Sequence, residues 1–95
     1  MLEKAYSLEN NKPYIPDSIG WAYYLIDDYV KAEKYMKRAI ELMPNDAIVS
    51  DHYGDILWKL GQKIQARYFW KSVLKINDVD EELLKKVNSK IIKGL

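Results

Sequence analysis

The sequence contains no cysteine among its 95 residues and a single histidine. Without cysteine there is no disulfide framework, no thiolate zinc site and no thiol nucleophile, and one imidazole cannot supply the several histidines that most metal sites use. None of the four glycines belongs to a phosphate-binding loop or a dinucleotide-binding motif. We therefore expect no metal, no cofactor and no catalytic residues, and an enzyme is the least favoured class of function.

Long hydrophobic runs are also missing, and no basic-then-apolar leader opens the sequence. We therefore expect neither a membrane span nor a signal peptide, and we predict a cytoplasmic location. The 15 Lys and Arg and the 14 Asp and Glu leave a net charge of +1, while 48% of the residues are hydrophobic. This composition excludes a disordered or strongly charged chain, and the length suits one domain with one modest core.

The chain repeats itself at an offset of 34 residues. Identical residues recur at this offset, among them the pairs Ala5 and Ala39, Leu8 and Leu42, Asp17 and Asp51, Gly20 and Gly54, Ala32 and Ala66, and Lys37 and Lys71. Between the glycines and prolines, the apolar residues have helical spacing, and no stretch shows the sustained alternation of a strand. The sequence therefore predicts an all-α fold built from a repeated helical unit.

The helices and the turns between them can be placed from the sequence. We predict helices near residues 1–9, 16–27, 29–43, 47–60, 63–76 and 80–93. Pro16 suits a first helical turn, Pro44 ends a helix, and Gly61 provides another helix end. Short connections make consecutive helices antiparallel, and we expect small residues where those helices approach closely, at Gly20, Ala32, Gly54 and Ala66.

A resemblance to the tetratricopeptide repeat family is carried by two consecutive segments, GWAYYLIDDYVKAEKYMKRAIELMPND and GDILWKLGQKIQARYFWKSVLKIND. In the first repeat, the positions of the family pattern are Ile19, Gly20, Tyr23, Ala32, Met36, Ala39 and Pro44. In the second, they are Tyr53, Gly54, Leu57, Ala66 and Trp70, while Val73 replaces an alanine and Asp78 replaces the proline. The phrases DSIGWAYY and DHYGDILW also resemble the terminal repeats of bacterial multi-repeat proteins.

The resemblance implies a right-handed solenoid of helical hairpins in one domain, residues 1–95. Residues 13–46 and 47–80 are the two full repeats, residues 1–12 a leading half-repeat helix, and residues 81–95 a C-terminal capping helix. Asn88 stands where the repeat expects a small glycine, so we expect the last helix to close the stack with a polar outer face.

Two groups of side chains have the residue types of catalytic or metal sites. Ser50, Asp51 and His52 could supply a hydrolase triad, but neighbours on a helix are turned about 100° apart and do not face one another. Asp27 and Asp28 could form an acid–base pair or part of a cation site. Their position in a turn before a helix favours a role in stabilising that helix.

The C-terminal segment holds the one concentration of basic residues, Lys85, Lys86, Lys90 and Lys93. Because they share a helix with leucines and isoleucines, they could contact nucleic acid or an anionic membrane. We favour a capping role, in which the apolar stripe covers the second repeat and the lysines stay in water. Nucleic acid and membrane are therefore the less favoured partners.

In stacked helical pairs, the first helix of each unit lines a concave surface. The core stripe of these helices is expected at Ile19, Tyr23, Ile26, Tyr53, Ile56, Leu57 and Leu60. The residues left for a partner are Tyr14, Asp17, Trp21, Tyr24, Asp51, Asp55 and Trp58. Large aromatic rings beside carboxylates could hold apolar side chains and attract Lys or Arg. Burial of Trp21 and Trp58 between repeats is the alternative.

The sequence therefore predicts a protein–protein interaction scaffold that binds a peptide or partner helix with apolar and basic residues. Family members that hold a terminal carboxylate use Lys, Arg and Asn on this face, whereas the resembling places here hold acids and Trp21, so a carboxylate should be repelled. One alternative is a homo-oligomer formed through residues 1–9, whose apolar side chains lack a partner helix. The other is an adaptor for membranes or nucleic acid that acts through the C-terminal lysines.

Overall fold

A computed structural model describes residues 14–95 of the chain, with side chains from residue 18 onward. This part contains five helices and no strand: α2 Tyr14–Leu25, α3 Tyr29–Leu42, α4 Ala47–Lys59, α5 Lys63–Val73 and α6 Glu81–Lys93. The all-α prediction is confirmed for these residues, whereas the helix predicted at 1–9 lies outside them. None of the five helices has the length and hydrophobicity needed to cross a membrane.

The turns follow from the residues that punctuate the sequence. Asp27 adopts a left-handed backbone with φ 64°, which ends α2, and its carboxylate accepts a hydrogen bond from the Tyr29 hydroxyl at 2.8 Å. Asp28 caps α3, because its carboxylate accepts a hydrogen bond from the backbone nitrogen of Lys31 at 3.3 Å. The expectation that this acidic pair serves the turn and the helix start is confirmed. Gly61, with φ 85°, provides the left-handed residue between α4 and α5.

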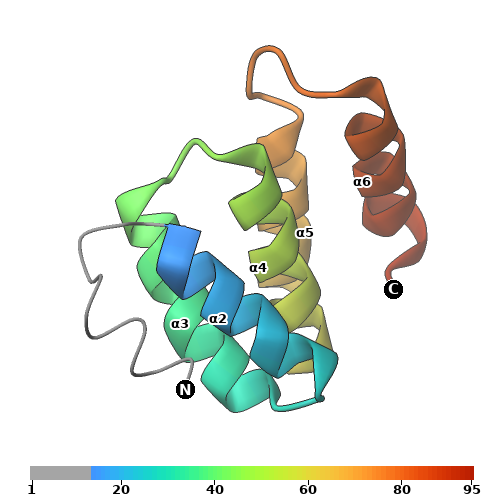
Figure 1. The fold of residues 1–95 in the computed structure, drawn as a ribbon. Coiled ribbons are helices and arrows are strands. Elements are labelled where there is room, and N and C mark those ends of the chain that lie inside the picture. Colours follow the sequence, from blue (N-terminus) through green and yellow to red (C-terminus); the bar gives the residue numbers. More distant parts are fainter. Residues whose placement is uncertain (1–13) are drawn as a thin grey trace.

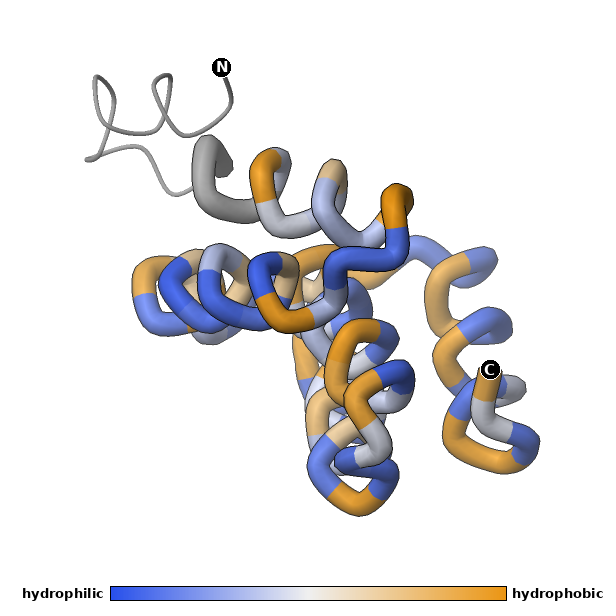
Figure 2. The backbone as a smooth tube through the Cα atoms, turned by 90° about the horizontal axis from the view of Figure 1, so that it is seen from below, coloured by the Kyte–Doolittle hydropathy of each residue, from blue (hydrophilic) through white to orange (hydrophobic). Residues whose placement is uncertain are grey.

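The helices form two antiparallel hairpins, α2 with α3 and α4 with α5, followed by α6 (Figure 1). The first hairpin packs on the second through α3 and α4, and α6 packs against α5. Figure 2 shows hydrophobic and hydrophilic segments alternating along the helices, which is typical of helices that bury one side. The arrangement is that of a short helical-hairpin solenoid.

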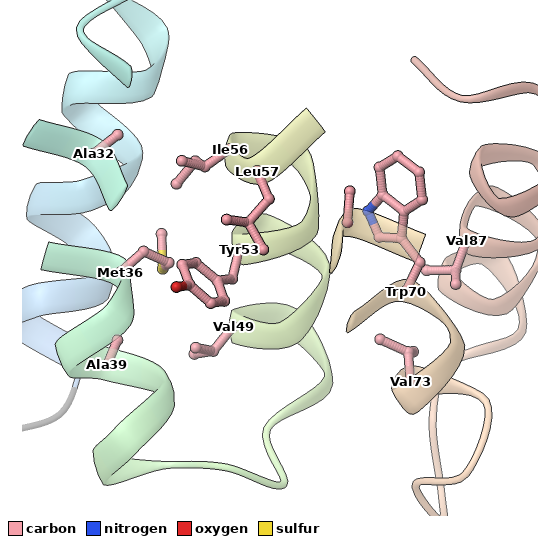
Figure 3. Close-up of a cluster of buried hydrophobic side chains, with 11 residues drawn as sticks. Ala32, Met36, Ala39, Val49, Tyr53, Ile56, Leu57, Trp70, Val73 and Val87 are labelled. Carbon is pink, nitrogen blue, oxygen red and sulfur yellow. The ribbon is translucent and has the colours of Figure 1, made fainter. Parts of the chain in front are cut away.

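The core runs through this stack from α3 to α6 (Figure 3). Between the two hairpins, Met36 of α3 faces Tyr53 of α4. On the other side of α4, the fully buried Trp70 of α5 lies against Val87 of α6. The remaining buried members of this cluster are Ala32, Ala39, Val49, Ile56, Leu57, Ala66 and Val73. The second hairpin is therefore covered on both sides.

Two glycines allow the helices of each hairpin to approach closely. A Cβ atom at Gly20 would lie 3.1 Å from the carbonyl oxygen of Ala32, and one at Gly54 would lie 2.5 Å from the indole nitrogen of Trp70. Both distances are shorter than ordinary van der Waals contact, so only glycine fits without displacing a neighbour. The predicted close crossings at these positions are confirmed.

One expected core residue is exposed. Ile26 is 70% accessible, so its assignment to the core stripe is wrong. The physical reason is local: α2 ends at Leu25 rather than at residue 27, so Ile26 lies in the turn and not on the packed side of a helix. Ile19, Tyr53, Ile56 and Leu57 are buried as expected, while Tyr23 and Leu60 are half-buried.

Candidate functional site

The residues predicted to bind a partner fall into three groups in the structure. Tyr14 and Asp17 belong to α2, but their side chains lie outside the described part. Trp21 and Tyr24 on α2 and Trp58 on α4 are half-buried. Asp51 and Asp55 on α4 are buried, with exposed fractions of 7% and 5%. The expectation that both carboxylates face an open groove is wrong, and their surroundings show why.

We call the cluster of Asp51, Asp55 and Lys90 the acidic clasp. Contact with Lys90 of α6 explains why the two carboxylates are buried. The ammonium of Lys90 on α6 lies 2.7 Å from Asp51 Oδ1 and 2.9 Å from Asp55 Oδ1. Trp70 Nε1 donates a hydrogen bond to Asp55 Oδ1 across 3.1 Å. The carboxylates that seemed free in the sequence are therefore paired with the capping helix and with the core.

The clasp contains two carboxylates and one ammonium, so it carries an excess of negative charge when both acids are ionised. Burial raises the pKa of Asp55, and the neighbouring Asp51 raises it further, while Lys90 and Trp70 oppose the shift. Burial alone would lower the pKa of Lys90, but its hydrogen bonds and attraction to the two carboxylates outweigh burial and raise it. Lys90 therefore keeps its positive charge in the clasp, where two carboxylates surround its ammonium.

A second group, which we call the aromatic stack, joins the two hairpins. Trp21 of α2 stacks on His52 of α4 with ring centres 3.8 Å apart, and it stacks on Tyr24 at 4.5 Å. All three side chains stay partly accessible. Trp21 is thus neither a purely groove-facing residue nor a fully buried core residue: it packs between repeats and keeps part of its surface open.

Tyr24 connects the aromatic stack with the acidic clasp. Burial, followed by the negative charge of Asp55, the neighbouring Tyr29 and the charge of Asp51, raises the pKa of Tyr24 to about 12. The ring of Tyr29 also lies near, tilted and 5.6 Å from that of Tyr24. The partly open aromatic surface therefore lies within the electrostatic reach of the clasp.

Trp58 has basic rather than acidic neighbours. The charged groups of Lys63 and Arg67 each lie 5.0 Å from the centre of its ring. Arg67 also donates a hydrogen bond from Nε to the carbonyl oxygen of Ile91 at 3.0 Å. At the end of α6, Gly94 lies so close that an added Cβ atom would collide with the Trp58 ring. The expected acidic surroundings of Trp58 are therefore a wrong prediction, because α6 and α5 cover this ring.

The C-terminal lysines divide into two kinds. Three of them are exposed as predicted: Lys85, Lys86 and Lys93. The predicted exposure of Lys90 is wrong, because Lys90 is part-buried in the acidic clasp. A signal for this role exists in the repeat itself. Lys90 stands 34 residues after Ile56, a fully buried core position of α4, and a cation at such a position requires carboxylates nearby.

The adjacent Ser50, Asp51 and His52 do not form a triad. The Ser50 hydroxyl is buried without a hydrogen-bond partner, Asp51 binds Lys90, and His52 stacks on Trp21. Their side chains go to different neighbours, as helical geometry predicts. Among residues 14–95, no group of three or more His, Cys, Asp and Glu side chains is arranged to hold a metal ion.

The structure also has a hollow that the sequence did not predict, between the loop joining α3 to α4 and the loop joining α5 to α6. It measures about 320 Å³ and is lined by Asn45, Asp46, Ala47, Ile48, Ile76, Asn77, Asp78, Val79, Asp80 and Leu83. Asp46 is already engaged there as the cap of α4, since it accepts a hydrogen bond from the Val49 backbone nitrogen at 3.0 Å. None of the three residues of the aromatic stack lines this hollow.

Comparison with known families identifies the repeated unit. Residues 18–46 match the family described as the tetratricopeptide repeat, and this segment runs from α2 through α3 to the cap of α4. The chain contains a tetratricopeptide repeat. Tetratricopeptide repeats serve as scaffolds that bind protein partners. Among curated proteins, none matches this repeat protein.

Proposed function

We propose that this tetratricopeptide repeat protein is a non-enzymatic scaffold that binds a peptide or a partner helix with apolar and basic residues. The observation that carries the proposal is the aromatic stack, which stays partly accessible beside a clasp with excess negative charge. Aromatic rings offer a large apolar area, and their faces attract Lys and Arg. One surface can therefore recognise both kinds of ligand residue.

The proposed surface extends along α2. Tyr14, Asp17, Trp21 and Tyr24 recur at helical spacing, which brings them to one side of that helix. Trp21 and Tyr24 would hold the apolar side chains of the ligand, and Asp17 would attract a basic one. Asp51 and Asp55 add a long-range attraction for cations, because their joint charge exceeds that of Lys90.

The other functions considered have less support. Self-assembly through residues 1–9 depends on a segment outside the described residues. An adaptor that acts through the C-terminal lysines is weakened, because Lys90 is engaged in the acidic clasp. A terminal carboxylate is an unfavourable ligand, since the clasp would repel it.

A peptide-array screen at low and high salt tests the proposal. We expect peptides with Lys or Arg beside apolar residues to bind best, and to bind more weakly at high salt because salt screens the attraction. Replacing Trp21 and Tyr24 by Ala should weaken this binding. Tyr68→Ala is the matched control, because Tyr68 is 66% exposed on α5, away from the stack.

The screen uses thermal melting to confirm that each variant is folded. A preference for acidic peptides would contradict the proposal. Equal binding by the wild type and the folded Trp21→Ala and Tyr24→Ala protein would contradict it as well, because the ligand would then bind on another face.

A further inference from the structure

We infer that α4 and α5 form a helix-binding site, that α6 occupies this site within the chain, and that the partner is an amphipathic helix that replaces α6 there. The inference rests on the proposed function and deepens it, because it assigns a role to the buried Asp51 and Asp55 and to the half-buried Trp58. These residues would contact the partner only after α6 has left.

The C-terminal end of α6 makes several specific contacts with α4 and α5. Lys90 binds both carboxylates of the acidic clasp, and the carbonyl oxygen of Ile91 accepts a hydrogen bond from Arg67. Gly94, with φ 77°, fits against Trp58 where no side chain has room. Charge, a backbone hydrogen bond and shape thus act together over residues 90–94, as they do in a recognition site for a short helix.

The rest of α6 is held less firmly than the other helices. Val87 is the one buried residue of α6, whereas α4 has eight buried residues. Most of the apolar side chains of α6 that face the core, Leu83, Leu84 and Ile91, are half-buried. Because α6 packs mainly against one helix, α5, we expect it to open locally before the whole fold does.

The clasp defines the partner's charge. When α6 leaves, Asp51 and Asp55 lose their ammonium, and any helix that covers the two carboxylates again must supply a cation. A helix with Lys or Arg at this place satisfies them, whereas an acidic or neutral helix leaves them unpaired.

The spacing of the contacts defines the partner's pattern. In α6, apolar Val87 precedes Lys90 by three residues, apolar Ile91 follows directly, and Gly94 lies four residues after the lysine. We expect the same order in the partner: an apolar residue, a Lys or Arg one turn later with an apolar neighbour, and a small residue one further turn along.

Occupation by α6 lowers the apparent affinity for this partner, because only the fraction of molecules with an open site can bind it. A change that weakens the docking of α6 but leaves α4 and α5 intact should therefore strengthen binding. Gly94→Ala is such a change, since its Cβ collides with Trp58. Gly61→Ala is the matched control, because Gly61 also has a positive φ of 85° but has no atom near its Cβ position.

The experiment uses the full chain and a labelled synthetic peptide with the sequence of residues 80–95, followed by fluorescence anisotropy. We expect the peptide to bind Gly94→Ala about tenfold more tightly than the wild type or Gly61→Ala, since overpacking by one methyl group destabilises a contact to this degree. A peptide with Lys90→Glu should not bind. Equal affinity of the peptide for the two glycine variants, or binding by the Lys90→Glu peptide, overturns the inference.

Hydrogen exchange provides a readout that does not depend on the proposed function. The amides of α6 should exchange faster than those of α2–α5, and addition of the peptide should accelerate them further. If α6 exchanges only when the whole protein unfolds, the inference is wrong, even if array peptides still bind at Trp21 and Tyr24. Loss of array binding together with rapid exchange of α6 would instead reject the proposed function. If light scattering shows wild-type dimers that the peptide dissociates, the occupant is a second copy, and the assignment of a separate partner is overturned.

Discussion

The indole nitrogen of Trp70 on α5 donates a hydrogen bond to the carboxylate of Asp55 on α4 across 3.1 Å. Trp70 is fully buried, and the same carboxylate binds Lys90 of α6. One acid thus joins three helices. A residue expected to meet a partner is a structural link between the second repeat and the capping helix.

The close approach of α4 and α5 predicts the effect of a methyl group at Gly54. We expect Gly54→Ala to lower the free energy of unfolding by about 1 to 3 kcal/mol, because its Cβ would displace the Trp70 ring and disturb the bond to Asp55. Gly20→Ala should lose less, since the nearest atoms there lie 3.1 Å away. Denaturant unfolding measures both. Equal stability of Gly54→Ala and the wild type would contradict the predicted packing.

The acidic clasp predicts different effects for two lysines of the same helix. Lys90→Met should destabilise the protein by about 2 kcal/mol, because it leaves two buried carboxylates without their cation. Lys86→Met, at an exposed position of α6, should change stability by less than about 0.5 kcal/mol. Urea titration compares the two variants. Similar losses from both would mean that Lys90 is not paired in solution.

The raised pKa of Tyr24 predicts a loss of stability in alkali. Its pKa of about 12 in the folded protein exceeds the ordinary value of 10.0, so the folded hydroxyl keeps a proton that the unfolded hydroxyl loses. The unfolded state then binds fewer protons, and stability falls as the pH rises from about 10 to about 12.

The pKa of Lys90 is also raised, so Lys90 adds to the loss of stability as the pH rises above its ordinary pKa of 10.5. Tyr24→Phe should make the decline shallower, whereas Tyr68→Phe, on the exposed side of α5, should not. Unfolding curves recorded at several pH values between 9 and 12 provide the measurement. An unchanged slope in Tyr24→Phe would contradict the assigned environment of this hydroxyl.

The buried hydroxyl of Ser50 has no hydrogen-bond partner, so we expect that its removal does not destabilise the protein. Ser50→Ala should leave stability unchanged or raise it by up to about 1 kcal/mol, because it removes a buried polar group that has no hydrogen-bond partner. Ser72→Ala should instead lower it by about 1 kcal/mol, since that hydroxyl donates to the Phe69 carbonyl oxygen at 2.6 Å. Thermal melting ranks the two. A large loss in Ser50→Ala would reveal a partner for the hydroxyl.

Much of the fold could be predicted from the sequence, because it depends on local rules and on a repeated pattern. Helical spacing of apolar residues locates α3 and α4, and Asp28 and Gly61 mark helix boundaries through their local chemistry. The 34-residue offset then places Gly54 by analogy with Gly20. Ile26 shows the limit of such rules, since a helix that ends two residues early turns a predicted core residue outward.

The candidate site depended on the tertiary structure. Asp51 and Lys90 are 39 residues apart in the chain, and Asp55 and Lys90 are 35 apart, so no local rule pairs them. On the helix, the carboxylates have the spacing of a solvent-exposed side, and only the position of α6 decides that they are buried. Sequence alone determined which residues form helices and hairpins, because backbone hydrogen bonds and helical periodicity are local. Tertiary structure decided which helix sides remain open, because desolvation of a charge depends on what packs over it.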